Sequence, residues 1–301
     1  MYVKEHSIFT PSNIYLFVKK LICFTFSIIC CLQMEAQQHF YMSFFGGATA
    51  YKGDLGSPSF PLAKPNAVGG IGMMFQLNNR MLIRTDLNYG KISGSDAYSI
   101  KTKDRNLSFA SKVTEFSIAF EYILFDLDEY KVSPYFFLGV GTFKFSPYTF
   151  DQNGNRVMLA ELGTEGQGFY ENRKEYKLQE IVIPFGGGLQ WALSPNKRIA
   201  LEMGIRKTNT DYLDDVSTTY VDADLLRQFR GGTSQRLAYR GGEINNSRGY
   251  PRDGAIRGNP NNKDWYLFTG LSFRVSLQPT LKRRVYKFRP VPAKTSCPRV
   301  F

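Results

Sequence analysis

The sequence predicts an all-β fold, an eight-stranded antiparallel transmembrane β-barrel of the outer-membrane type with long external loops and a periplasmic C-terminal tail. Segments in which apolar and polar residues alternate with a period of two recur along residues 37–277, as in strands with one apolar and one polar face. The connections between these segments alternate between short and long. The chain is rich in Phe (25), Tyr (18) and Gly (27). After its N-terminal segment, no apolar run approaches the roughly twenty residues that a membrane helix needs.

Residues 1–36 have the pattern of a secretory signal peptide. Two lysines precede the apolar run LICFTFSIICCL at 21–32, and a small residue, Ala36, precedes the predicted cleavage site. A lipoprotein signal is the alternative, but Cys30 follows two isoleucines and not small residues. The chain is therefore predicted to be exported, and its only cysteine after cleavage, Cys297, has no partner for an intramolecular disulfide.

Eight strands are predicted within the barrel segment. In 80–90, Ile83 and Leu87 face one way and Arg84 faces the other, which is the pattern of a strand between two different environments. Equally regular alternation predicts further strands at 112–125, 197–207 and 264–277. Less regular strands are predicted at 40–51, 67–77, 132–145 and 178–192.

The order of connection lengths distinguishes a membrane barrel from a soluble sandwich. The short connections are 78–79, 126–131 and 193–196, and the long ones are 52–66, 91–111, 146–177 and 208–263. Outer-membrane barrels have tight periplasmic turns and long external loops, and an even number of strands returns both termini to the periplasm. Trp191 and Trp265 fall at opposite strand ends, as interfacial aromatic residues do. The alternative is a soluble lipocalin-like barrel that binds a ligand.

In a membrane barrel the apolar face contacts lipid and the polar face lines the lumen. The interior of an eight-stranded barrel is only wide enough for side chains to fill it, so the charged residues there must pair with one another. This predicts a structural luminal plug, with a conduit as the alternative. The predicted luminal charge cluster consists of Arg84, Asp86, Glu115, Glu121, Glu202, Arg206 and Arg274.

No catalytic, cofactor or metal residues are predicted, and the protein is not expected to be an enzyme. Enzymes built on small outer-membrane barrels use a histidine near the external rim. After cleavage the chain keeps only His39, at the opposite end of the first strand. The glycine-rich segment GTEGQG at 163–168 lies in a long loop, without the preceding strand and following helix of a phosphate-binding loop, and is predicted to form turns.

The acidic segment TDYLDDVSTTYVD at 210–222 is predicted to order a loop over the barrel mouth. Asp211, Asp214 and Asp215 lack the alternate spacing and the central glycine of a calcium loop, which is the alternative reading. Local hydrogen bonds to the backbone are the favoured role for these carboxylates. Arg206 or Lys207 is the expected charge partner.

Residues 278–301 carry seven of the basic residues behind the net charge of +12, and no acidic residue. Nucleic acid is not expected as a partner, because the chain is predicted to be exported. Four prolines oppose a helix. The tail is either a solvated segment near anionic headgroups or a docking segment that becomes ordered on a periplasmic partner, and its aromatic residues favour docking. The docking candidates are Lys282, Arg283, Arg284, Tyr286, Lys287, Phe288 and Arg289.

Several segments together resemble the PorG family of Bacteroidetes outer-membrane proteins. They are YKGDL, RNLSFASKVTEFSI, SPYFFLGVGTFKFSP, LGTEGQG and RKTNTDYLDDVSTTYVD. The resemblance implies a component of the type IX secretion system that is not itself the export channel and that ties the periplasmic ring of PorK and PorN to the outer membrane. It brings no catalytic or cofactor residues. The rival function is that of a generic surface barrel or adhesin acting through its external loops.

Overall fold

The computed structural model describes residues 40–55, 65–244 and 249–277. The predicted signal peptide at 1–36, His39 and the predicted docking tail at 278–301 lie outside the described residues.

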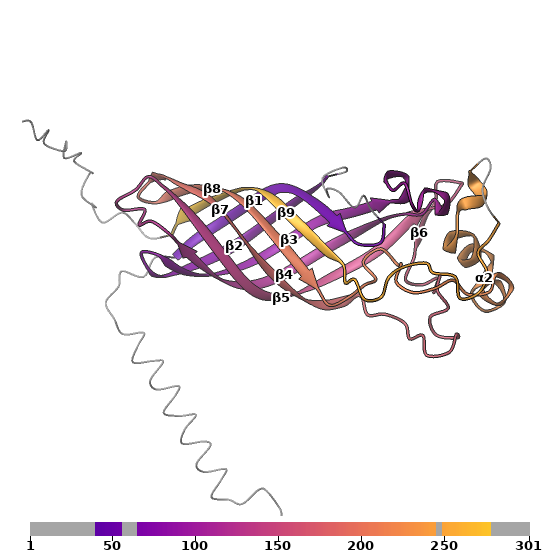
Figure 1. Cartoon of the computed structure of the whole chain (residues 1–301). Coiled ribbons are helices and arrows are strands. Elements are labelled where there is room, and N and C mark those ends of the chain that lie inside the picture. Colours follow the sequence, from indigo (N-terminus) through magenta and orange to yellow (C-terminus); the bar gives the residue numbers. More distant parts are fainter. Residues whose placement is uncertain (1–39, 56–64, 245–248, 278–301) are drawn as a thin grey trace, which may run out of the picture. The chain divides into compact units, whose positions relative to one another are not determined.

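The predicted fold class is confirmed: eight long antiparallel strands form a closed barrel (Figure 1). Each strand pairs with its neighbours along the chain, and pairing between the first and last strands closes the cylinder. The strands are β1 (Phe40–Lys52), β2 (Asn66–Asn78), β3 (Met81–Ser95), β4 (Ser108–Ile123), β5 (Val132–Phe150), β7 (Gln179–Ser194), β8 (Lys197–Thr208) and β9 (Trp265–Ser276).

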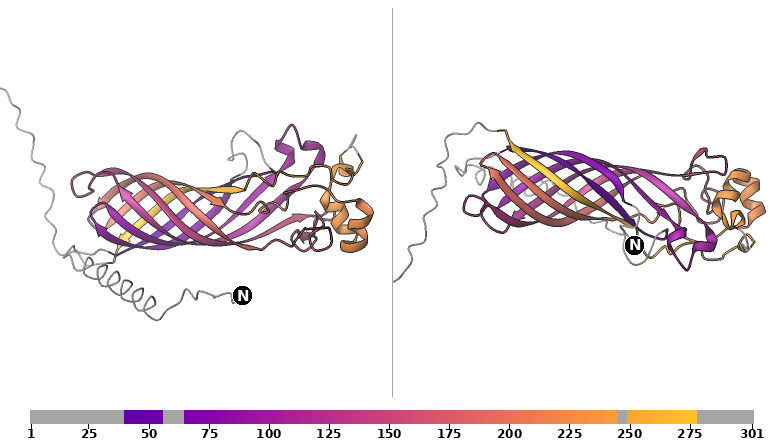
Figure 2. Two further views of the ribbon diagram at one scale, coloured as in Figure 1. Left: turned by 60° about the horizontal axis from the view of Figure 1, so that its bottom comes forward. Right: turned by 90° about the horizontal axis from the view of Figure 1, so that it is seen from above.

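Short and long connections lie at opposite ends of the barrel, which we call the turn end and the loop end. Figure 2 shows the long connections gathered at one end of the strands. Tight turns join β2 to β3 and β7 to β8 at the other end. The backbone N–H of Leu277 donates to the carbonyl of Phe40 at 2.8 Å, so the first and last described strands meet at the turn end.

Three strands extend further toward the loop end than their sequence predicts. β3 continues to Ser95, β5 continues to Phe150, and β4 begins at Ser108. In these extensions Ser95 pairs with Ser108, and Ala110 pairs with Tyr148. The apolar alternation is weaker here, although the backbone pairing continues, because serines occupy four of the outward positions: Ser93, Ser95, Ser108 and Ser146.

The long loops carry structure that the sequence did not predict. β6 (Arg156–Met158) pairs with β5, and α2 (Ala223–Ala238) lies in the longest loop. The Asp222 carboxylate caps α2 by accepting from two backbone N–H groups, and Gly231, with φ 86°, interrupts its helical geometry. In the described part of the chain, no helix is long and apolar enough to cross a membrane.

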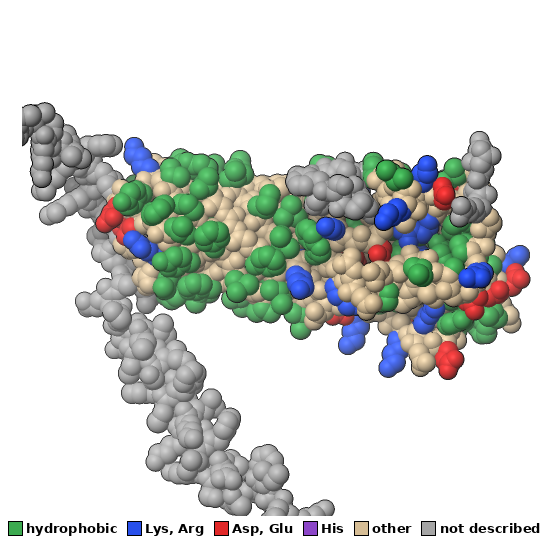
Figure 3. Space-filling model, in the orientation of Figure 1, with side chains coloured by type: hydrophobic (Ala, Val, Ile, Leu, Met, Phe, Trp, Pro, Cys, Tyr) green, Lys and Arg blue, Asp and Glu red, His purple; other side chains and the backbone are tan. Residues whose placement is uncertain are grey.

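The outer wall of the barrel is apolar. Figure 3 shows apolar side chains over the wall, with basic side chains at both ends of the barrel and more of them toward the loop end. Phe116, Ile118 and Phe120 of β4 are 44–48% exposed, whereas Glu115 and Glu121 of the same strand are fully buried. A soluble barrel would bury these apolar residues, so the exposed fractions identify the transmembrane arrangement.

The lumen is filled by side chains at three successive levels. Near the turn end, Tyr41, Leu82 and Ile123 belong to one apolar cluster. Near the loop end, Phe143 and Phe268 belong to a second cluster, which loop residues also enter. Between the two clusters lie charged residues, with Arg84 against Phe137 of the first cluster and Arg206 against Phe268 of the second.

Candidate functional site

Five of the seven predicted luminal residues form one bonded group, which we call the luminal charge network: Arg84, Asp86, Glu121, Glu202 and Arg274. Arg84 donates to Glu202 through both terminal nitrogens, at 2.8 and 2.9 Å, and to Glu121 at 3.1 Å. Arg274 donates to Glu121 at 2.5 Å and lies 3.6 Å from Glu202. Asp86 accepts from Arg84 Nε at 2.6 Å. Two arginines and three carboxylates thus bridge strands on opposite sides of the barrel.

The remaining two predicted luminal residues form a separate pair, with Arg206 Nε 3.5 Å from Glu115. Two tyrosines outside the predicted set also bind the luminal carboxylates. Tyr266 donates its hydroxyl to Glu115 at 2.7 Å, and Tyr135 donates to Glu202 at 2.8 Å. Tyr266 and Arg274 are separated by an even number of residues on β9, so their side chains point to the same face. The sequence alternation therefore predicts that Tyr266 points into the lumen.

The described loop residues pack into a cap over the loop end, formed by residues 53–55, 96–107, 151–178, 209–244 and 249–264. In the cap, the Asp214 carboxylate accepts from the Tyr51 hydroxyl at 2.7 Å and from the backbone N–H groups of Leu55 and Val216 at 2.9 and 3.0 Å. Tyr51 also donates to Asp264 at 2.9 Å. Asp214 therefore holds the start of the longest loop against the end of β1.

Asp215 is positioned from the other side of the cap. Its carboxylate accepts from the hydroxyls of Thr164 and Tyr176, at 2.5 and 2.7 Å. Its charge partner is Arg257, at 3.9 Å. The expected charge partners were wrong: Arg206 pairs with Glu115 inside the barrel, and Lys207 is exposed on β8.

The glycine-rich segment 163–168 is hydrogen-bonded to the acidic segment 210–222. Glu165 accepts from the backbone N–H groups of Ser217 and Thr218 at 2.9 and 3.0 Å, and from Arg257 at 2.8 Å. The adjacent Gly166 has φ 82°, and a Cβ there would lie 2.8 Å from a methyl group of Val221. The segment forms turns that place a buried carboxylate, and no signal in the sequence indicated this pairing.

The cap carboxylates are held in a low-dielectric setting that favours their neutral forms. Burial raises the pKa of Asp215 to about 7, against the opposing effect of Arg257. Burial likewise raises the pKa of Asp211, which is 2% exposed, to about 7. Burial and mutual repulsion raise the pKa of Asp264, which shares Tyr51 with Asp214. These pKa values all lie above those of an unfolded chain.

We expect the cap to lose stability as the pH rises. A carboxyl whose folded pKa is raised binds its proton more tightly in the folded state, so its contribution to stability is complete below the unfolded pKa and is lost as pH rises through the folded value. Hydrogen exchange of the Ser217 and Thr218 amides, compared at about pH 5.5 and about pH 8.5 after correction for intrinsic rates, should show weaker protection at the higher pH. Equal or stronger protection at the higher pH would contradict this assignment.

Asp214→Asn should destabilise the cap although it conserves shape. Both carboxylate oxygens of Asp214 accept from backbone N–H groups, so an amide nitrogen at either position faces a donor. The expected loss is about 1–3 kcal/mol of unfolding free energy, measured by urea denaturation in detergent. Asp104→Asn, at an exposed position of the cap, is the matched control and should change the free energy by less than about 0.5 kcal/mol. Equal effects of the two substitutions would refute the proposed role.

Within the described ranges, no group of three or more His, Cys, Asp or Glu residues is arranged to hold a metal ion. The docking candidates Lys282, Arg283, Arg284, Tyr286, Lys287, Phe288 and Arg289 lie outside the described residues.

A family described as "Domain of unknown function (DUF6089)" matches residues 19–236. Comparison with curated proteins gave no significant match. Among solved structures, the Neisserial surface protein A (NspA) is 10% identical, with a TM-score of 0.40, covering 78% of this chain and 96% of its own. Ail, the attachment invasion locus protein of Yersinia pestis, is 12% identical, with a TM-score of 0.36 and coverages of 79% and 99%. OprG from Pseudomonas aeruginosa is 10% identical, with a TM-score of 0.34 and coverages of 78% and 95%.

Proposed function

This chain belongs to the DUF6089 family, and on that premise we propose that it is a non-enzymatic outer-membrane barrel that anchors a protein-secretion machine without conducting its cargo. The machine we propose is the type IX secretion system, with the periplasmic ring of PorK and PorN as the partner.

The outer-membrane location is supported by the wall of the barrel. Lipid solvates apolar side chains but not backbone polar groups, so a closed sheet with an apolar exterior is stable there. Leu138 and Val140 of β5 are 61% and 59% exposed, and Met203 of β8 is 51% exposed. The pairing of β1 with β9 leaves no open edge in the barrel.

The filled lumen is the observation that carries the anchoring role. The luminal charge network spans the barrel, with the side chains of Arg274 and Glu121 2% and 0% exposed. The loop-end cluster lies above it, and the cap adds Leu213 and Val216 to that cluster. Such an interior favours a rigid membrane anchor over a conduit.

The secretion role rests on the sequence resemblance to PorG. Three of its five segments are bonded together in the cap. Tyr51 of YKGDL binds Asp214 of the acidic segment, and Glu165 of LGTEGQG shares Arg257 with Asp215 of that segment. The first strand, β1, begins at the turn end, and the last strand, β9, ends there. This is the end proposed to face the periplasm. The ring contact is assigned to this end and to the basic tail at 282–289.

Deletion of the gene is expected to abolish secretion by the machine and to reduce recovery of the ring proteins with the outer membrane. A chain lacking 279–301 should still insert but should recover less ring protein in a pull-down. As a matched control, the substitutions Lys101→Gln and Lys103→Gln remove positive charge from exposed loop-end positions and should leave recovery unchanged. Normal secretion in the deletion strain would overturn the secretion role, and full recovery by the truncated chain would overturn the tail contact.

A second candidate function, that of a surface barrel acting through its loops, is favoured by exposed apolar residues on the cap. Ile100 and Ile256 are 92% and 83% exposed. Exposed apolar residues of this kind occur at protein-binding surfaces. Under this alternative, replacing both by serine abolishes adhesion or surface binding while secretion stays normal.

A further inference from the structure

We propose that the outer face of β3–β5, at the loop end, binds the phosphorylated sugar headgroup of a glycolipid in the surrounding membrane leaflet. The site consists of a row of lysines, Lys91, Lys112 and Lys144, and the cavity beside it. This inference rests on the proposed outer-membrane location.

In the eight long strands, carboxylates and arginines lie on the inner face, and the charged residues of the outer face are all lysines. Alternate residues of a strand point inward and outward. All five carboxylates of these strands occupy inward-pointing positions, on the face opposite to the exposed apolar residues. The residues of outer parity carry only lysines as charged groups. At the loop end these outward lysines are Lys52, Lys91, Lys112, Lys144 and Lys207, and one further lysine, Lys197, lies at the turn end.

The lysines are concentrated on three adjacent strands. Lys91 and Lys112 are direct cross-strand partners, and Lys144 pairs with Thr114, one outward position from Lys112. Like charges directly opposite one another destabilise a sheet. Among the described residues, no carboxylate forms an ion pair with any of the three lysines. A bound anion would remove this repulsion.

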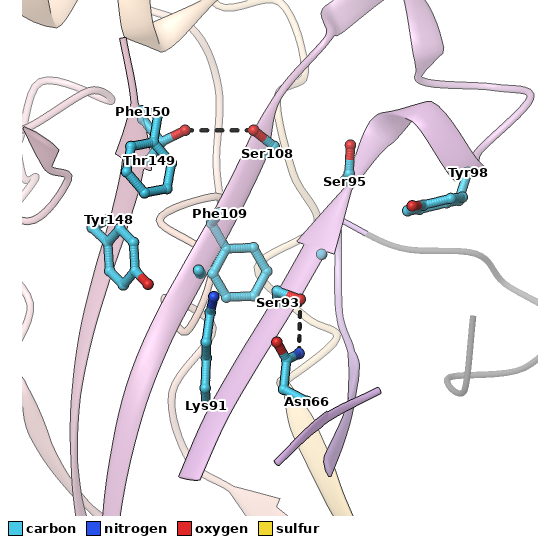
Figure 4. Close-up of a pocket in the computed structure, with 12 residues that line it drawn as sticks. Asn66, Lys91, Ser93, Ser95, Tyr98, Ser108, Phe109, Tyr148, Thr149 and Phe150 are labelled. Atoms are coloured by element: carbon cyan, nitrogen blue, oxygen red, sulfur yellow. Dashed lines mark hydrogen bonds between the residues drawn. The ribbon is translucent and has the colours of Figure 1, made fainter. Parts of the chain in front are cut away.

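Lys91, the member of this row on β3, lines a cavity of about 340 Å³ between the extended ends of β3, β4 and β5. Figure 4 shows Lys91 in the cavity between Tyr148 and Ser93. Further hydroxyl groups line it from Ser95 and Ser108. This volume is within the range of small-ligand sites, roughly 300–1,000 Å³.

The chemistry of the lining fits a phosphorylated sugar. Lysine ammonium groups bind phosphate as point charges, and serine hydroxyls donate to and accept from sugar hydroxyls. The exposed Tyr98 ring adds an apolar face with a polar tip. The exposed apolar residues Tyr89 and Leu87 continue down β3 from Lys91, so the acyl chains of the same lipid have a wall to lie against.

The test is native mass spectrometry of the full chain in detergent with added bisphosphorylated lipid A. Each lysine near an anionic headgroup contributes roughly a fivefold gain in affinity, so the double substitution Lys91→Gln and Lys112→Gln should weaken binding on the order of twenty-fivefold. The matched control, Lys197→Gln with Lys207→Gln, removes the same charge from outward positions away from the cavity and should change affinity by less than about threefold. Heat-modifiable gel migration checks that all variants fold.

Three competitor arms identify what the site recognises. Dephosphorylated lipid A and phosphatidylglycerol should each bind more weakly than bisphosphorylated lipid A, and inorganic phosphate should not displace it at matched concentration. Equal losses in the two double variants, equal binding of phosphatidylglycerol, or displacement by inorganic phosphate would each overturn the inference. Failure of the wild-type chain to insert into phosphatidylcholine vesicles would instead overturn the membrane location, so the two failures are distinguishable.

Discussion

Glu202→Ala is expected to destabilise the barrel by about 3–5 kcal/mol, because it removes a carboxylate that accepts three hydrogen bonds inside a buried ionic group. Glu202 is 2% exposed and accepts from Arg84 at two positions. It also accepts from the Tyr135 hydroxyl at 2.8 Å. The truncation therefore leaves two N–H groups of Arg84 and the Tyr135 hydroxyl without this acceptor, although Arg84 keeps Asp86 and Glu121 as charge partners. Urea unfolding in phosphatidylcholine vesicles, followed by tryptophan fluorescence, measures the change.

Glu180→Ala is the matched control for this substitution. Glu180 is a half-buried carboxylate of β7 that forms no ion pair among the described residues. Its removal should change the unfolding free energy by less than about 0.5 kcal/mol. If Glu202→Ala were as mild as the control, the hydrogen bonds that Glu202 accepts would not hold the luminal charge network together.

Arg257→Ala should release the cap while leaving the barrel folded. The guanidinium of Arg257 is buried and donates to Glu165 at 2.8 Å and to the carbonyl of Asp215 at 2.5 Å. Its own carbonyl accepts from Arg105. Without Arg257, the Glu165 carboxylate loses its charge partner inside the cap. The expected loss of cap stability is about 3–5 kcal/mol.

Limited proteolysis of the folded barrel measures this effect, because cleavage within 151–178 and 209–264 reports cap opening while the strands remain protected. Arg252→Ala removes an exposed arginine five residues away and should leave the cleavage rate within about twofold of the wild-type rate. Unchanged cleavage in Arg257→Ala would show that Arg257 does not hold the cap. Loss of the folded barrel in that variant would show that the cap and the strands unfold together.

The parity of the strands explains how much of the interior could be predicted. A strand forces alternate residues to opposite faces, so the apolar exterior fixes which charges point inward. Parity does not specify which strands face each other across the lumen. Arg206 was therefore placed correctly inside but was assigned the wrong partner. Tyr135 and Tyr266 were missed because a tyrosine on the polar face gives a weaker signal than a charge.

The cap was beyond sequence reasoning for a different reason. Tyr51 and Asp214 are 163 residues apart in the chain, and their contact joins two irregular segments. Periodicity reports on local geometry and carries no information about such pairs. Within the cap, a local sequence pattern indicates α2: the capping residue Asp222 precedes a run that contains two leucines and a phenylalanine.

Electrical recording across a planar lipid bilayer tests most directly the claim that the barrel is a sealed anchor. The wild-type chain, inserted and verified as folded, should give no steady single-channel current, because the luminal charge network and the two apolar clusters fill its interior. A stable, reproducible open conductance of the folded wild-type barrel would contradict the account.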